Sequence, residues 1–142
     1  MRPEYETELD RANERDVAAL IGNYWGVRMV KTPRRYPYDY LAIDYADNAQ
    51  ALIEVKARKN EAGRYPTYLI SLAKIVDCQT AANVSGLVFY LVVGFTDKIM
   101  FWQFQDNEFF VNFGGRSDRG DNQDREPMAF IPMEHFEVLD VT

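Results

Sequence analysis

The stretch that decides the fold is "YPYDYLAIDYADNAQALIEVKARKN", residues 36–60. It contains two runs of strand length, "YDYLAID" (38–44) and "ALIEVKAR" (51–58), on either side of "YADNAQ" (45–50). Because Asp47 and Asn48 favour turns, the pattern predicts a β-hairpin. The second strand carries an acid and a base, Glu54 and Lys56, one residue apart. Such a pair indicates either a salt bridge on an exposed sheet or part of an active site.

Successive side chains of a strand point to opposite faces. One face of the second strand would carry Leu52, Glu54, Lys56 and Arg58, and the other Ile53, Val55 and Ala57. The second of these sets is apolar, so we expect it to pack on a helix. The face with Glu54 and Lys56 is expected to look over a cleft or solvent.

The register of the hairpin decides which other side chain joins this pair. If the turn centres on Asp47 and Asn48, then Lys56 lies opposite Asp39 and Glu54 lies opposite Leu41. Asp39 and Glu54 are then diagonal neighbours on one face, about 7–8 Å apart at Cα. A slip of one residue would move them to opposite faces.

Two carboxylates and an ammonium group on one face suit phosphoester chemistry. Hard divalent cations such as Mg²⁺ take oxygen ligands from one or two carboxylates and keep several waters. The bound metal can generate a nucleophilic water, and a neighbouring lysine can orient that water or neutralise developing charge. A salt bridge would account for Glu54 and Lys56, but it would leave Asp39 unexplained.

The rest of the chain predicts an α/β domain. A helix is expected over residues 7–25, because Val17, Leu20, Ile21 and Tyr24 recur at helical spacing before Gly26. The remaining predicted elements are a strand at 27–32, a helix at about 68–83, strands at 86–95 and 98–104, and a C-terminal extension. The order α-β-β-β-α-β-β, with a helix crossing over after the hairpin, predicts a mixed sheet.

The motif Pro37-Tyr38-Asp39 … Glu54-Val55-Lys56 resembles that of the PD-(D/E)xK nuclease superfamily. The resemblance covers about residues 8–105 and departs from the family pattern in placing Tyr38 between proline and aspartate. It implies a restriction-endonuclease-like αβββαβ core, in which a mixed central sheet is flanked by helices. We expect this core and the C-terminal extension to form a single domain, residues 1–142.

The resemblance also implies roles for residues of the motif. Asp39, Glu54 and the main-chain carbonyl of Val55 would bind Mg²⁺ (or Mn²⁺), and Lys56 would be the catalytic base or orient the water. Many members add a glutamate from the first helix, and Glu14 lies on the inward face of that predicted helix. An arginine partner would explain Glu14 equally well.

Gln79 interrupts the apolar face expected for the second helix, which is made of Tyr68, Leu72, Ile75 and Ala82. Some members of the superfamily place a glutamine or a lysine there, near the scissile phosphate. We therefore include Gln79 among the candidate catalytic residues. A polar residue satisfied at the edge of the core is an equally good interpretation.

Charge is distributed unevenly along this acidic chain. The net charge is −6, which argues against indiscriminate binding of nucleic acid. Residues 28–64, however, hold eight basic and five acidic side chains, a net of +3, so the rest of the chain carries −9. This zone could steer a polyanion to the hairpin. The candidates for contacts with DNA phosphates are Arg34, Arg35, Arg58 and Lys59, with Arg116 and Arg119 of the loop "GGRSDRGD" (114–121).

Other classes of protein fit the sequence less well. One cysteine, Cys78, and one histidine, His135, are too few for a disulfide framework or a structural zinc site. The N-terminal residues lack the apolar run of an export signal, and no apolar run approaches the roughly 20 residues of a membrane span. We expect a soluble, cytoplasmic protein without a membrane partner.

Three functions are therefore weighed. The first is a Mg²⁺-dependent deoxyribonuclease, an endonuclease of DNA repair, recombination or restriction. The second is a non-catalytic DNA- or protein-binding module on the same fold, since a fold does not fix a function. The third, weaker one is an assembly factor that acts through the aromatic C-terminal segment. Because resolvases of this fold are dimers, the resemblance makes a homodimer a further expectation.

Overall fold

The computed structural model describes residues 8–115 and 125–139. The first half of the chain forms α1 (Glu8–Trp25), β1 (Arg28–Lys31), β2 (Tyr40–Ile43), β3 (Ala49–Ala57), the 3₁₀ turn η1 (Ala62–Arg64) and β4 (Thr67–Ser71). The second half forms α2 (Leu72–Ser85), β5 (Val88–Gly94), β6 (Ile99–Gln103), β7 (Phe110–Gly115), β8 (Arg125–Pro132), η3 (Met133–His135) and β9 (Glu137–Val138).

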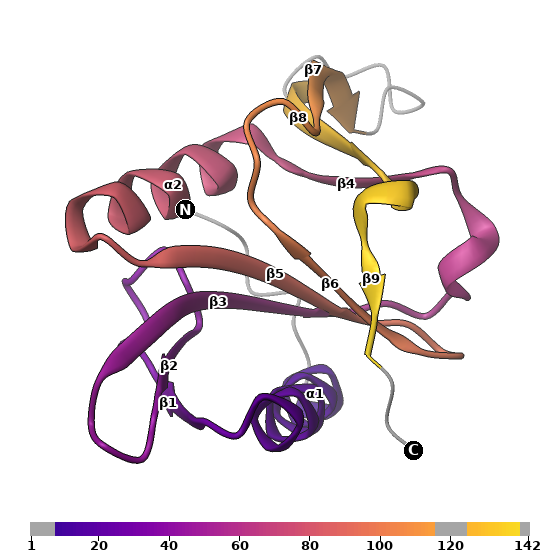
Figure 1. Ribbon diagram of the computed structural model, residues 1–142. Coiled ribbons are helices and arrows are strands. Elements are labelled where there is room, and N and C mark those ends of the chain that lie inside the picture. The colour runs from indigo at the N-terminus through magenta and orange to yellow at the C-terminus, as the bar shows by residue number, and fades with distance from the viewer. Residues whose placement is uncertain (1–7, 116–124, 140–142) are drawn as a thin grey trace.

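The elements are arranged in layers around a six-stranded mixed sheet of order β1-β2-β3-β5-β6-β9. Only β3 and β5 pair in parallel among its described strands, and the segment between them contains the crossover helix α2. Figure 1 shows α1 on one face of this sheet, with α2 and a smaller sheet, β4-β8-β7, on the other. The predicted restriction-endonuclease-like core with helices flanking a mixed sheet is confirmed.

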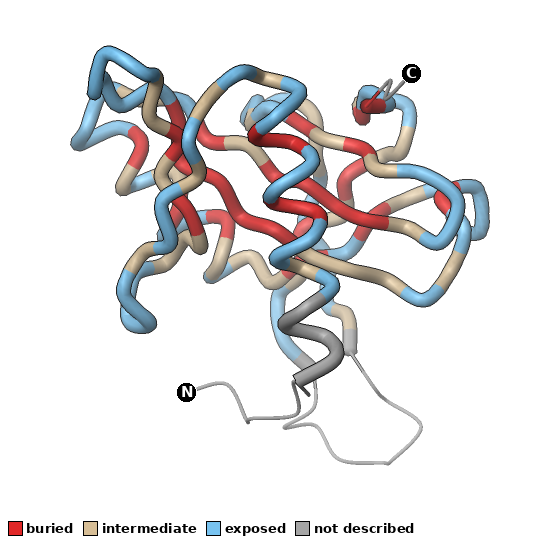
Figure 2. Tube along the Cα trace, turned by 90° about the horizontal axis from the view of Figure 1, so that it is seen from below, coloured by how far each residue is buried: buried red, intermediate tan, exposed pale blue. Residues whose placement is uncertain are grey.

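Each face of the central sheet has its own apolar core. On the α1 side, Val17, Ala18 and Ile21 of the helix pack against Ile53 and Val55 of β3. On the other side, a larger core joins the central strands with α2, β4 and β8 (Leu52, Tyr68, Ile75, Phe89, Trp102 and Ile131 among its buried residues). Figure 2, seen from the α1 side, shows these buried stretches running through the middle of the molecule. β3 is therefore covered on both faces.

Helix α1 has the predicted extent but a different inward stripe. It ends at Trp25, and Gly26 follows with a φ of +68°, the left-handed conformation that glycine adopts at little cost. The buried stripe consists of Val17, Ala18 and Ile21, whereas Leu20 and Tyr24 are 42% and 48% exposed. Ala18 therefore takes a place in the buried stripe that the prediction gave to Leu20 and Tyr24.

The segment Thr67–Ser71 is strand β4 and not the start of a helix as predicted. This segment is rich in β-branched and aromatic residues and follows Pro66, features that favour a strand. It pairs along its whole length with β8, so Tyr68 packs in the sheet instead of on a helix face. The partner strand lies about 60 residues further on in the sequence, which local periodicity cannot reveal.

The C-terminal segment is part of the fold and not an appendage. Strand β8 lies between β4 and β7, and β9 covers the edge of the central sheet beside β6. Within the described residues, no helix is long and apolar enough to cross a membrane. Arg116 and Arg119, which we proposed as phosphate contacts, lie outside the described residues.

The hairpin of β2 and β3 forms with a register two residues away from the prediction. Tyr40 pairs with Ile53 and Leu41 with Leu52, and the register shifts at Ala42/Ile43. The turn spans Asp44–Asn48, because the carboxylate of Asp44 accepts hydrogen bonds from the backbone amides of Ala46 and Asn48. A shift of two residues preserves the face of every side chain. It also places Asp39, one residue before β2, directly across from Glu54.

Candidate active site

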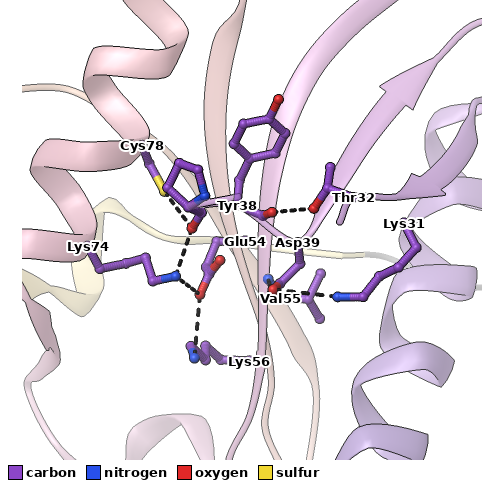
Figure 3. A network of polar contacts seen from close by, with 10 residues as sticks. Lys31, Thr32, Tyr38, Asp39, Glu54, Val55, Lys56, Lys74 and Cys78 are labelled. Carbon is purple, nitrogen blue, oxygen red and sulfur yellow. Dashed lines mark hydrogen bonds and ion pairs between the residues drawn. The ribbon is translucent and has the colours of Figure 1, made fainter. Parts of the chain in front are cut away.

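Glu54 is a buried carboxylate between two lysines. Only 1% of the residue is exposed, because α2 covers this face of β3. Its Oε2 atom lies 3.4 Å from Lys56 Nζ and 3.5 Å from Lys74 Nζ. Figure 3 shows Glu54 between the two ammonium groups. Its other oxygen, Oε1, is buried and has no hydrogen-bond partner among the described residues. The expectation that Glu54 looks out over a cleft or solvent is wrong.

Burial sets the protonation of this group. Loss of solvent around Glu54, reinforced by the negative charge of Asp39, raises the pKa of its carboxyl to about 7. Lys56 and Lys74 act in the opposite direction but do not cancel the effect of burial. Removing a carboxylate from water favours the neutral form unless the charge is fully compensated. The ionised site is therefore short of positive charge.

Asp39 is held beside Glu54 by the backbone of both neighbouring strands. Its Oδ2 accepts a hydrogen bond from the amide of Val55 at 2.9 Å, and its Oδ1 lies 3.8 Å from Lys31 Nζ. Its own amide donates to the carbonyl of Ile53, and its carbonyl accepts from the amide of Thr32. Asp39 thus lies in a fixed position where the chain enters β2.

Lys74 is the site residue that sequence reasoning missed. Its Nζ donates to the carbonyl oxygen of Pro37 at 2.7 Å while it contacts Glu54. Cys78, one helical turn later, donates its thiol to the same carbonyl at 3.4 Å. Residues four apart share a face of a helix, so buried Cys78 marks the Lys74 face as inward. The face predicted for this helix runs through Ile75, Gln79 and Ala82 and so does not include Lys74.

Two other candidates, Gln79 and Glu14, lie on the two helices. The side chain of Gln79 donates to Asn83 Oδ1 at 3.1 Å and turns along the helix away from Lys74. Glu14 is half-buried on α1, where it adds to the rise in the pKa of Tyr40 that burial and Asp39 mainly cause. Across the residues that the structure describes, no three His, Cys, Asp or Glu side chains gather as a metal-binding group.

The basic candidates surround the site at different depths. Arg34 and Arg35 are exposed in the loop between β1 and β2, close in sequence to Asp39. Lys59 is exposed just after β3. Arg58 is half-buried, with its guanidinium 5.0 Å from the centre of the Tyr68 ring. In sequence, Arg34 and Arg35 precede Asp39 by four or five residues, and Arg58 and Lys59 follow Glu54 by four or five.

The donor set fits a hard divalent cation. Asp39 and Glu54 supply carboxylate oxygens, and buried Oε1 of Glu54 lacks the partner that such an atom requires. Val55 donates its amide to Asp39, and its carbonyl lies on the same edge of β3. Oxygen ligands of this kind, with water completing the shell, are those that Mg²⁺ and Mn²⁺ take.

The family follows from comparison with known sequences. Residues 1–139 match the model of the family described as "Phage putative PDDEXK endonuclease". The chain belongs to this family. It is therefore a DNA endonuclease of the PD-(D/E)xK type, and members of that type depend on a divalent metal. No match was found among curated proteins.

A solved structure supports the fold of this PDDEXK endonuclease. The structure of this chain is similar to that of Hjc of Archaeoglobus fulgidus, a Holliday junction resolvase from an archaeal hyperthermophile. The TM-score is 0.56 and the identity is 19%, over 84% of this chain and 87% of the resolvase chain. At this identity the likeness bears on the fold, which agrees with the layers described above.

Proposed function

We propose that Asp39, Glu54 and the carbonyl of Val55 bind Mg²⁺, or Mn²⁺ in its place, and that the chain hydrolyses DNA phosphodiester bonds there. The metal would supply Lewis acidity and activation of a water molecule. Lys56, 3.4 Å from Glu54, would orient that water or accept its proton. Arg34, Arg35, Arg58 and Lys59 would contact phosphates and position the DNA. We propose the same contact with DNA phosphates for Arg116 and Arg119.

The observation that carries this proposal is the buried, incompletely paired carboxylate of Glu54. A carboxylate that is 1% exposed and leaves one oxygen without a partner costs folding free energy. Such groups recur at functional sites, where a ligand completes them. A divalent cation between Asp39 and Glu54 would supply the missing charge, and Asp39 is already aimed by its bond to Val55.

Lys74 joins this proposal as a second cation beside the phosphate. Its Nζ is anchored on the Pro37 carbonyl, so its position relative to Glu54 is fixed before DNA binds. A fixed charge stabilises developing negative charge without reorganisation during the reaction. Gln79 and Glu14 stay as weaker proposals, Gln79 for contact with the DNA strand and Glu14 for a water-mediated contribution to the metal shell.

The decisive experiment is cleavage of linear, nicked and branched DNA with Mg²⁺, Mn²⁺ or EDTA. We expect metal-dependent cleavage that falls about 10³-fold in Glu54→Gln and in Lys56→Met. Glu137→Gln, on β9 at the edge of the sheet, and Lys98→Met change exposed charges outside the site and serve as matched controls. Cleavage that survives in both site variants would refute the assignment of these residues.

The same DNA panel addresses the substrate and the assembly. Because the similar fold of Hjc is that of a Holliday junction resolvase, four-way junctions belong in the panel as a candidate substrate. We propose a homodimer, which would present two sites to two DNA strands. Sedimentation with and without DNA tests this, and a monomer on the cleaved substrate would refute it.

A non-catalytic binding module remains the competing proposal. It predicts that isothermal titration detects no Mg²⁺ or Mn²⁺ binding, even with DNA present. The nuclease proposal predicts binding of the metal that is lost in Glu54→Gln.

A further inference from the structure

A pocket of about 360 Å³ lies beyond the end of β3, next to the carboxylate site. Its walls come from the loop after β3, from β4 and from the segments after β5 and β8. The side chains that matter below are Arg58, Asn60, Tyr65, Thr67, Tyr68 and Phe95. Among the described residues of the lining, Arg58 is the only one with a formal charge, and none is an acid. In a chain of net charge −6, this pocket favours an anion.

The pocket combines a held guanidinium with aromatic surface. Arg58 lies over the ring of Tyr68 at 5.0 Å, and one of its amino groups donates to the carbonyl of Ala57. A guanidinium has further N–H donors, and their fork suits an anion such as phosphate. Phe95 contacts Tyr68 edge to face at 6.4 Å, and Tyr65 is 56% exposed at the mouth. Asn60 and Thr67 add hydrogen-bonding groups.

The pocket and the proposed cleavage site are linked along the chain, because Arg58 of the pocket directly follows β3. Glu54, Lys56 and Arg58 alternate onto the same face of this strand, so all three face the α2 side of the sheet. The rise of a strand puts Arg58 about 6.6 Å beyond Lys56 and about 13 Å beyond Glu54. A stacked nucleic acid strand advances about 3.4 Å per nucleotide. Measured from the proposed metal ligands Val55 and Glu54, the pocket is therefore about three to four nucleotides away.

We propose that this pocket takes a single unstacked nucleobase of the DNA strand that is cut, with the phosphate of that nucleotide paired to Arg58. The base would stack on Tyr65 and meet Asn60 and Thr67 with its polar edge. Bases that leave the helix are bound in this way, on aromatic faces beside a cationic group. The inference rests on the proposed nuclease function and narrows its substrate to DNA with unpaired nucleotides near the cut.

Binding measured in EDTA tests the pocket without any cleavage. The probe is a series of forked DNAs, and each of them carries one abasic nucleotide at a different position of its single-stranded arm. For the wild-type protein, we expect one or two adjacent positions where loss of the base weakens binding about 5- to 100-fold. In Tyr65→Ala, removal of the base at those positions should weaken binding by less than about twofold, because the base and the tyrosine ring act as one coupled pair. Tyr65 is exposed, so the substitution does not disturb the core.

Tyr45→Ala, which removes a 75% exposed tyrosine at the hairpin turn, is the matched control and should keep the wild-type pattern. The proposal is overturned if no abasic position matters, or if the same positions matter equally in Tyr65→Ala. It is also overturned if Tyr65→Ala weakens forked and fully paired DNA by the same factor. Loss of cleavage in Glu54→Gln tests the metal site separately, so either proposal can fail while the other stands.

Discussion

The two faces of β3 are built from alternate residues of one strand, yet they have opposite effects on the stability of the fold. Ile53 and Val55 face α1 and are fully apolar and buried. Leu52 and Glu54 face α2 and are equally buried, but Glu54 is a carboxylate and two lysines lie close to it. Burial of the first face stabilises the fold, whereas burial of the charged group on the second face costs folding free energy.

This difference shows how the fold holds a costly group in place. Glu54 cannot turn towards water, because its backbone is paired with β5 and its neighbours Ile53 and Val55 are fixed in the α1 core. The apolar face therefore acts as the rigid support of the polar one. Precise placement on packed strands is what a catalytic constellation requires.

The largest expected effect comes from replacing Glu54 with an apolar residue, which makes the α2 face of β3 as apolar as the α1 face. Glu54→Leu should reduce metal-dependent cleavage about 10³-fold, because the proposed ligand is gone. The same change should raise the free energy of unfolding at pH 8 without metal, because it removes a buried carboxylate whose pKa is raised to about 7, while the Lys56 and Lys74 side chains keep some contact with solvent. Cleavage assays and urea denaturation check the two parts. A less stable variant would contradict the comparison.

The opposite change weakens the apolar face. Ile53→Ala should lower the free energy of unfolding by about 2–5 kcal/mol, because Ile53 is fully buried and a cavity remains. Cleavage per folded molecule should stay near that of the wild type well below the melting temperature. Val84→Ala, at an 85% exposed position, is the control and should be close to neutral. A specific loss of cleavage in Ile53→Ala would show that the supporting face also determines the chemistry.

The next effect is a dependence of stability on pH. Since burial raises the pKa of Glu54 from 4.5 to about 7, the folded protein binds more protons than the unfolded chain between these values. Without metal, the contribution of Glu54 to the free energy of unfolding should fall by about 3 kcal/mol as pH rises through this window. Glu54→Gln should remove this slope, and saturating Mg²⁺ should reverse it in the wild type. Thermal melts from pH 4.5 to 8 measure both.

The smallest expected effect concerns Lys74. Lys74→Met should reduce kcat about tenfold and move the pH profile of cleavage upward, because one of the charges that lowers the pKa of Glu54 is lost. Lys98→Met, an exposed lysine far along the chain, should leave both unchanged. An unchanged pH profile in Lys74→Met would mean that Lys74 only anchors the Pro37 loop.

The sequence predicts the fold well where patterns are local. The extent of α1, the hairpin, the apolar strand after α2 and the mixed sheet are visible as periodicity and turn residues. The strand β4 is not visible in this way, because it depends on pairing with β8, far along the chain. A short apolar run beside a helix is ambiguous until its partner is known.

The candidate site is predicted in composition but not in environment. Asp39, Glu54 and Lys56 converge because the parity of the hairpin was right even though its register was not. The burial of Glu54 and the approach of Lys74 come from the way α2 packs over β3, and a single sequence does not show packing. Gln79 shares the predicted helix face with buried Ile75 and Ala82, and its side chain bonds along the helix to Asn83.

The parallel pairing of β3 with β5 has a consequence for the order of folding. Glu54 pairs with Leu91, and the crossover between them must close a loop of more than 30 residues before this pairing can form. Helix α2, which brings Lys74 to Glu54, lies inside that loop. Non-local pairings of this kind form slowly compared with hairpins. Recovery of cleavage during refolding should therefore follow the slowest structural phase, which makes activity a reporter of the completed fold.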